Sequence, residues 1–188
     1  MPTRSRILDE ATKLFAQKGY SAASMRELAD AVGLSKPALY YHFSSKESLF
    51  LAAVRMHMEH YRQTLLDAIE EPGSLRDRML CGIEAHLTRV REHPEVMKLL
   101  LTAEHRPEEG VPEIDLLSMH QENTRLLTQI LQAAVSSGEI RRDLNLDTLA
   151  ISLVGLVNIW SLHCLQGLPL PENLPEHILD IFLNGVSP

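Results

Sequence analysis

Apolar residues recur at helical spacing along most of the 188-residue chain, and no stretch alternates apolar and polar residues as a half-buried strand does. Short breaks that contain Gly, Pro and Ser separate the periodic segments. The pattern predicts an all-α fold of nine helices. We expect them over residues 4–18, 24–33, 35–43, 44–68, 75–92, 95–105, 114–137, 146–166 and 175–184.

Capping residues support several of these helix starts. Ser24 and Glu27 form the S-x-x-E pattern of a capping box, in which each side chain accepts a hydrogen bond from the other residue's backbone N–H. Ser44 and Glu47 have the same spacing before the long fourth helix. Ser35 is a hydroxyl N-cap for the short third helix.

The charge of the chain is unevenly distributed. The formal net charge is −7, which by itself argues against a nucleic-acid partner. Residues 1–50, however, hold seven Lys and Arg against five Asp and Glu, a balance of +2, whereas residues 51–188 hold eleven against twenty, a balance of −9. Such an asymmetry favours two functional parts, of which the first can approach an anionic partner.

Cysteine content and the N-terminal residues favour the cytoplasm. Cys81 and Cys164 are far apart in the sequence and belong to no pair with metal-ligand spacing, which is typical of a reducing compartment. Asp9 and Glu10 precede any long apolar run, so we expect no secretory signal.

One segment has the length and composition of a membrane span. Residues 148–165 contain no Asp, Glu, Lys or Arg. Asn158 and His163 interrupt the run, however, and no basic cluster flanks it to set an orientation. We therefore expect a helix buried between other helices of a soluble protein.

The second and third predicted helices have the spacing of a helix-turn-helix. Ala29 is followed four residues later by Gly33, and six residues further by Leu39. A small residue lets the two helices cross closely, glycine supplies the tight turn, and the leucine fills the wedge between the helices. In this geometry the third helix is the recognition helix that enters the major groove of double-stranded DNA.

Side chains on and around this helix suit contact with DNA. Lys36 can donate to guanine acceptors, and Ala38 can contact a thymine methyl group. Lys46, in the first turn of the next helix, lies on the unfavourable side of its helix dipole unless a phosphate is bound there. The predicted DNA-binding residues are Ser24, Arg26, Ser35, Lys36, Pro37, Ala38, Tyr40, Tyr41, His42 and Lys46.

Residues 7–54 resemble the DNA-binding domain of the TetR family of transcriptional regulators, through the segments ILDEATKLFAQKGY, SMRELADAVGLSK and LYYHFSSKESL. The resemblance covers about a quarter of the chain. It implies a homodimer whose subunits have a three-helix DNA-binding head, residues 1–46, and a divergent domain for dimerisation and small-molecule binding, residues 47–188. It also implies DNA contacts at Lys36, Pro37, Ala38, Tyr40, Tyr41, His42 and Lys46.

The last two predicted helices carry apolar residues on more faces than one chain can cover. We expect residues 146–166 and 175–184 to form a four-helix bundle with a two-fold mate. Such a dimer would place two recognition helices about 34–36 Å apart, so the operator should be a pseudo-palindrome. The predicted interface residues are Leu149, Leu153, Val157, Cys164, Ile178, Ile181 and Phe182.

A pocket for a largely apolar effector is expected among the middle helices. Its candidate residues have apolar bodies or polar tips, although most of them could equally be plain core. His86, Glu104 and Asn123 stand out because they are polar residues on mostly apolar helices. The full set is His60, Met79, Ile83, His86, Met97, Leu101, Glu104, Asn123, Leu127 and Trp160.

These patterns predict a dimeric, ligand-responsive transcriptional regulator, with repression favoured over activation by the resemblance alone. Two alternatives stay open: a metal-sensing regulator that uses His57 and His60, and a helical enzyme or carrier with a vestigial DNA-binding head. The scattered histidines form no set of three or four converging zinc ligands. No nucleophile elbow or oxyanion loop is present in the sequence. We therefore expect no catalytic residue, metal or cofactor.

Overall fold

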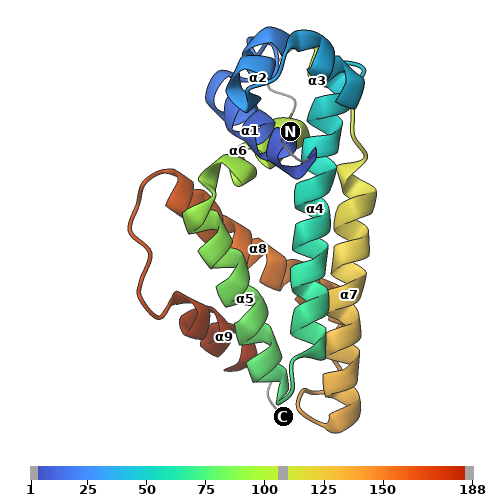
Figure 1. Cartoon of the computed structure of the whole chain (residues 1–188). Helices are drawn as coiled ribbons and strands as arrows, with labels where there is room; N and C mark the ends of the chain where they lie inside the picture. Colours follow the sequence, from blue (N-terminus) through green and yellow to red (C-terminus); the bar gives the residue numbers. More distant parts are fainter. Residues whose placement is uncertain (1–3, 106–109, 185–188) are drawn as a thin grey trace. The chain divides into compact units, whose positions relative to one another are not determined.

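The computed structural model describes residues 4–105 and 110–184 (Figure 1). Over these residues it contains nine helices and no strand, which confirms the predicted all-α fold. The helices are α1 (Arg4–Lys18), α2 (Met25–Val32), α3 (Lys36–His42), α4 (Lys46–Glu70), α5 (Leu75–Glu92), α6 (Pro94–His105), α7 (Leu116–Ser137), α8 (Leu146–Leu165) and α9 (Leu174–Asn184).

The cap of α4 differs from the sequence prediction by one residue. The backbone N–H of Ser45 donates to Oγ of Ser48 at 3.1 Å, and the N–H of Ser48 donates to Oγ of Ser45 at 3.0 Å. The predicted capping box of Ser44 and Glu47 is therefore wrong. A serine hydroxyl at the third position accepts the N-cap N–H as well as a carboxylate does, so the two registers compete and the structure has the later one.

The chain divides into two compact units that do not follow the predicted boundary after residue 46. The first unit is Met1–His60 with His93–Leu116, and the second is Tyr61–Glu92 with Leu117–Pro188. The long helix α4 thus contributes residues to both units, and α6 belongs with the N-terminal helices.

Aromatic residues form the centre of the first unit. The rings of Phe15 and Phe50 meet edge to face with 5.2 Å between centroids, and Tyr20 lies 5.0 Å from Phe50. Phe15 and Phe50 are almost completely buried. Helix α6 packs along α1 (Figure 1). Because edge-to-face aromatic pairs add to the free energy of area burial, this cluster is a firm base for α2 and α3.

The second unit is built around α5, which packs against α8 and α9 (Figure 1). Its fully buried residues include Leu87, Leu131 and Leu179. A carboxylate from the turn after α7 caps α5, since Oε2 of Glu139 accepts the N–H of Leu75 at 2.6 Å. This bond satisfies one of the free donors of the first turn of α5.

Helix α8 has one buried face. Among the described residues it is the one helix long and apolar enough to cross a membrane, and only 22% of it is buried within the chain. Ala150 and Leu153 face the core, while Ile151 is 62% exposed and Ile159 is 59% exposed. Within the single chain α8 is therefore covered on one side, and its apolar residues Ile151 and Ile159 lie on the other.

Candidate DNA-binding helix and effector cavity

The turn between α2 and α3 has the geometry that the spacing predicted. Gly33 adopts a left-handed conformation with φ +71°, which glycine reaches without strain. The N–H of Leu34 donates to the carbonyl of Ala29 at 2.9 Å, which closes the end of α2. Ala29 is 1% exposed, and Leu39 is fully buried. The small residue and the leucine therefore occupy the contact between the two helices.

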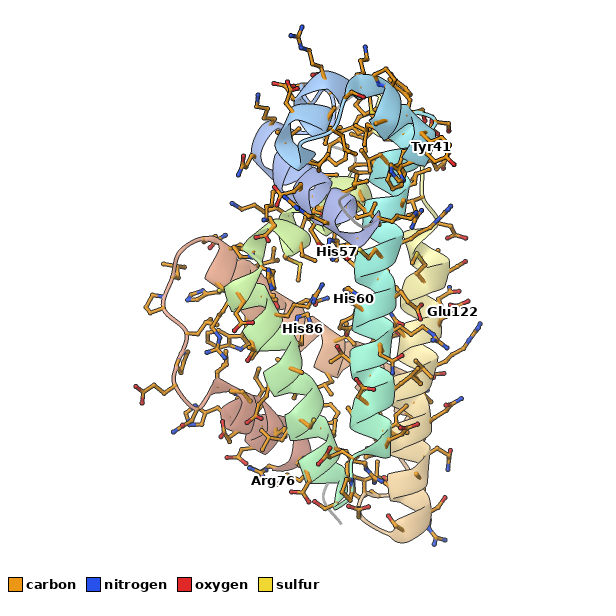
Figure 2. All side chains as sticks on the ribbon, viewed as in Figure 1. Tyr41, His57, His60, Arg76, His86 and Glu122 are labelled. Carbon is orange, nitrogen blue, oxygen red and sulfur yellow. The ribbon has the colours of Figure 1, made fainter. Side chains whose placement is uncertain are left out.

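Helix α3 buries one residue and presents most of the others to solvent. Leu39 is its buried residue, whereas Tyr40 is 42% exposed and Tyr41 is 89% exposed. Figure 2 shows the Tyr41 side chain projecting away from the ribbon. Lys36 lies over the ring of Tyr40, with its ammonium 5.9 Å from the centroid. An exposed face that combines aromatic rings with a cation is suited to contact with sugars, phosphates and bases.

The N-cap of α2 is occupied by its own capping box. Both the N–H and the hydroxyl of Ser24 donate to Oε2 of Glu27, at 3.0 and 2.8 Å, as the sequence predicted for a capping box. Lys18 donates to the other carboxylate oxygen at 2.5 Å. The hydrogen bond from Lys18, followed by those from Ser24, lowers the pKa of Glu27 to about 2. An ionised carboxylate beside Ser24 disfavours a phosphate there, so Arg26, which is exposed, is the better candidate of that pair.

Lys46 has partners within the chain. Its Nζ donates to the carbonyl of Tyr20 at 2.9 Å and to that of Ser21 at 3.3 Å. The ammonium also lies 4.3 Å from the centre of the Tyr20 ring. These contacts satisfy the cation that seemed to require a phosphate. They tie the turn between α1 and α2 to the start of α4, which gives Lys46 a positioning role.

A buried polar pair joins α1 to α4 inside the first unit. Thr12 donates its hydroxyl proton to the carbonyl of Leu8 at 2.8 Å. Its oxygen also lies 2.9 Å from Nε2 of His57, and it can only accept there because its single proton is already used. His57 therefore carries a proton on Nε2. Thr12 and His57 are 1% and 4% exposed.

The histidines of α4 do not form a metal centre. The ring of His60 lies 6.2 Å from that of His57. Within the described part of the chain, no three His, Cys, Asp or Glu residues are close enough together to hold a metal ion. The alternative of a metal-sensing regulator therefore has no ligand set in this region.

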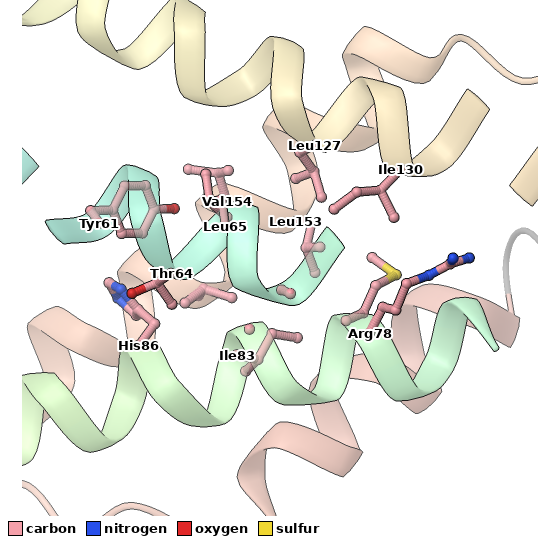
Figure 3. Close-up of a pocket in the computed structure, with 14 residues that line it drawn as sticks. Tyr61, Thr64, Leu65, Arg78, Ile83, His86, Leu127, Ile130, Leu153 and Val154 are labelled. Atoms are coloured by element: carbon pink, nitrogen blue, oxygen red, sulfur yellow. The ribbon is translucent and has the colours of Figure 1, made fainter. Parts of the chain in front are cut away.

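The second unit contains a cavity between α4, α5, α7 and α8 (Figure 3). The space between its lining atoms amounts to about 510 Å³, a volume that includes open solvent. Most lining side chains are apolar, which is typical of small-molecule sites. The lining residues are Tyr61, Thr64, Leu65, Ala68, Arg78, Met79, Gly82, Ile83, His86, Leu127, Ile130, Leu153, Val154 and Val157.

The cavity contains four of the ten predicted pocket residues: Met79, Ile83, His86 and Leu127. His60, Met97 and Leu101 lie in the first unit instead. Asn123 is buried and Trp160 packs against the core, and neither lines this cavity. The side chain of Glu104 falls outside the described residues. Helical periodicity identifies an inward face without saying which neighbouring helix that face meets.

Polar groups from three helices gather at one end of the cavity. Nε2 of His86 lies 3.0 Å from Oγ of Ser161, and the ring of Tyr61 lies 5.5 Å from that of His86. Burial, with a smaller contribution from the positive charge of Arg89, lowers the pKa of His86 to about 4. Burial also raises the pKa of Tyr61. Both groups are consequently neutral at physiological pH.

Comparison with known proteins identifies the relatives of this arrangement. Residues 7–53 match the profile of bacterial regulatory proteins, tetR family. The chain belongs to the TetR family of transcriptional regulators. The recognition geometry of α2 and α3 is therefore that of a DNA-binding regulator.

Two curated relatives illustrate the similarity. The HTH-type transcriptional repressor KstR2 of Mycolicibacterium smegmatis is 28% identical over 190 residues, which cover 98% of this chain and 90% of that protein. The HTH-type transcriptional activator FasR of the same organism is 32% identical over 108 residues, which cover 57% of this chain and 49% of FasR. Both are named as transcriptional regulators and neither as an enzyme.

Solved structures share the fold over the whole chain. The TetR family regulator PfmR of Thermus thermophilus matches with a TM-score of 0.77 and 26% identity, over 95% of this chain and 97% of that chain. FadR of Bacillus subtilis, solved with stearoyl-CoA, matches with a TM-score of 0.79 and 17% identity, over 98% of this chain and 100% of that chain. The second likeness shows the fold alone.

The predicted dimer residues of this TetR protein lie on two different faces. Leu153, Val157, Ile178 and Phe182 are buried in the core of the chain itself. Leu149 and Cys164 are half-buried, and Ile181 is 71% exposed. The exposed apolar residues Ile151, Ile159 and Leu168 are not in the predicted set. Apolar residues occur on most sides of α8, so its composition carried little signal for which face turns inward.

Proposed function

We propose that this TetR protein is a repressor that binds a pseudo-palindromic operator as a homodimer and is released by a small molecule bound in the cavity of the second unit. The observation that carries the proposal is the surface of α3, where one residue is buried and Lys36, Tyr40 and Tyr41 are exposed. A recognition helix of this kind, on a closely packed α2, is suited to the major groove.

The exposed apolar face of α8 and α9 supports dimerisation. Ile151, Ile159 and Ile181 are each more than half exposed. Large apolar side chains of this number on two adjacent helices are typical of a protein–protein contact. A two-fold axis through this face would form a four-helix bundle and would present two recognition helices to one operator. A cytoplasmic location follows from the same proposal.

The relatives support repression over activation. The match to the KstR2 repressor extends over nearly all of both chains, whereas the match to the FasR activator covers about half of FasR. In a repressor of this design, an effector need only bind the DNA-free state more tightly than the operator-bound state, by a few kcal/mol. Helix α4 is the element that can transmit the effect of effector binding to the recognition helix. It follows α3 in the chain, and it lines the cavity with Tyr61, Thr64 and Leu65.

The test begins with selection of host genome fragments by the purified full-length protein at near-physiological salt, followed by sequencing. We expect a pseudo-palindrome with half-sites one helical turn apart. Substituting Tyr41→Ala should weaken binding to this site by about 10-fold or more, because the side chain is a surface group of the recognition helix and has no part in the core. Binding measured by fluorescence anisotropy over a range of salt concentrations would check this.

The matched control is Gln132→Ala, an exposed residue of α7, which should keep the affinity of the wild-type protein. Lys46→Ala is a poor test of DNA contact, since it also removes the bonds to Tyr20 and Ser21. A folded, dimeric protein that enriches no sequence at any salt concentration would contradict the proposal and would favour a carrier with a vestigial head.

A further inference from the structure

The polar end of the cavity carries information about the effector, provided that the cavity is the effector site as proposed above. His86 from α5 and Tyr61 from α4 line this end, and the buried Ser161 from α8 bonds to His86 (Figure 3 shows the two lining residues). The three side chains belong to three helices of one unit, so their chemistry is built by the tertiary structure. None of them is charged at physiological pH.

The hydrogen bonds of Ser161 determine the tautomer of His86. The Ser161 hydroxyl donates to the carbonyl of Val157 at 3.0 Å, as a helical serine does when it bonds back one turn. Its only proton is used there, so towards His86 it accepts. His86 therefore carries its proton on Nε2. Its other ring nitrogen, Nδ1, keeps a lone pair and is a hydrogen-bond acceptor.

Tyr61 supplies the complementary group. Its ring meets His86 edge-on, with 5.5 Å between centroids. Burial raises the pKa of Tyr61, so its hydroxyl stays protonated and can donate a hydrogen bond. A hydroxyl in this setting gains from a ligand that accepts its proton. The end of the cavity thus offers a neutral acceptor on His86 and a neutral donor on Tyr61, next to the hydroxyl of Thr64 (Figure 3).

The far end of the cavity contains the one charged lining residue. Arg78 lies eight residues before His86 on α5, a separation of about 12 Å along the helix. Its Nε is buried without a hydrogen-bond partner, and its Nη2 lies 3.8 Å from Oε1 of Glu139. The N–H of Leu75, with Ser137 and Arg78, lowers the pKa of Glu139. The carboxylate therefore stays ionised and offsets the charge of Arg78.

We propose that the effector is an uncharged, largely apolar molecule with one hydroxyl group, which donates to His86 and accepts from Tyr61. A carboxylate cannot donate a proton to the lone pair of a neutral imidazole, and its desolvation in an apolar cavity is costly. A hydroxyl group, in contrast, can both donate and accept a hydrogen bond. The apolar body would extend along α5 between Ile83, Leu127 and Leu153.

The test compares three probes of equal chain length on the full-length protein at pH 7.5: n-decanol, methyl decyl ether and sodium decanoate. Titration calorimetry, or fluorescence of the single tryptophan Trp160, measures each affinity. We expect n-decanol to bind about 10-fold more tightly than decanoate, because the anion meets an uncharged acceptor and an apolar wall. The ether should bind about 5-fold more weakly than the alcohol, since it accepts from Tyr61 but cannot donate to His86.

Two variants separate the two hydrogen bonds. Tyr61→Phe should weaken n-decanol and the ether by the same factor, about 5-fold, since both accept from the tyrosine. His86→Phe should weaken n-decanol alone and so remove the difference between alcohol and ether. Gln132→Ala, outside the cavity, should bind all three probes as the wild-type protein does.

Several outcomes would overturn the inference. Tighter binding of decanoate than of n-decanol would contradict it. If Arg78→Met then abolished the preference for decanoate, the charge of Arg78 would be what the cavity recognises the effector by. Equal binding of alcohol and ether, or no binding of any probe, would also contradict the role of His86 and Tyr61. Release of operator DNA is measured separately. Selective binding of n-decanol that leaves operator affinity unchanged would support the site chemistry and would count against the proposed release mechanism.

Discussion

Two histidines of this protein make the same hydrogen bond in two different settings. His57, in the first unit, donates from Nε2 to a threonine hydroxyl, and His86, in the second unit, donates from Nε2 to a serine hydroxyl. In both pairs the hydroxyl bonds back to a carbonyl of its own helix. His57 is 4% exposed and packed inside the DNA-binding unit, whereas His86 lines a cavity that opens to solvent.

The comparison shows that surroundings decide what a buried polar pair does. Where no solvent reaches the pair, each partner depends on the other, and the bond ties α1 to α4 beneath the recognition helix. Where a cavity adjoins the pair, water or a ligand can replace either partner. The same chemistry then serves recognition rather than rigidity.

The largest effect is expected in the first unit. Thr12→Val keeps the shape of the side chain and removes the hydroxyl, which leaves the Nε2 proton of His57 unpaired in a closed site. The free energy of unfolding should fall by about 1–3 kcal/mol. Chemical denaturation of Thr12→Val beside Thr12→Ser, which keeps the hydroxyl, measures this. If the valine variant is as stable as the serine variant, the hydrogen bond between Thr12 and His57 does not stabilise the contact between α1 and α4.

A smaller effect is expected from the titration of His86. Its pKa in the folded state, about 4, lies below the unfolded value of 6.5, so between these pH values the unfolded chain binds more protons. Stability should therefore fall as the pH drops through this window. Discounted for the open cavity, the loss is on the order of 1–2 kcal/mol.

Thermal unfolding of the wild-type protein and His86→Phe from pH 7.5 to pH 4 checks this expectation. The variant lacks the titrating group, so the difference in melting temperature between the two proteins should shift in favour of the variant as the pH falls. A constant difference across the window would show that His86 titrates normally and that the cavity end is wetter than its packing indicates.

The smallest effect is expected for Ser161→Ala. The substitution removes the hydroxyl that accepts the hydrogen bond of His86. Water in the cavity can accept this bond instead, so the loss of stability should be below about 1 kcal/mol. Denaturation beside Thr12→Val gives the direct comparison. Equal losses of stability in the two variants would mean that water reaches neither histidine pair, and the two pairs would then not differ in their surroundings.

The sequence by itself determined the local features of this protein. The boundaries of α5 and the capping box of Ser24 and Glu27 are as expected, as is the left-handed Gly33 between α2 and α3. Each depends on residues three to six positions apart, and such local interactions can be predicted from sequence spacing alone. The recognition helix and its family followed from the same short-range pattern.

The tertiary structure alone decided what depends on contacts between distant segments. The partner of Lys46 lies 25 and 26 residues away in the turn after α1, and the partner of His86 lies 75 residues away on α8. Helix α8 is apolar on nearly every side, so periodicity could not tell its inward residue Leu153 from its outward residue Ile151. Burial is a property of what packs against a helix, and that is known only when the neighbouring helices are in place.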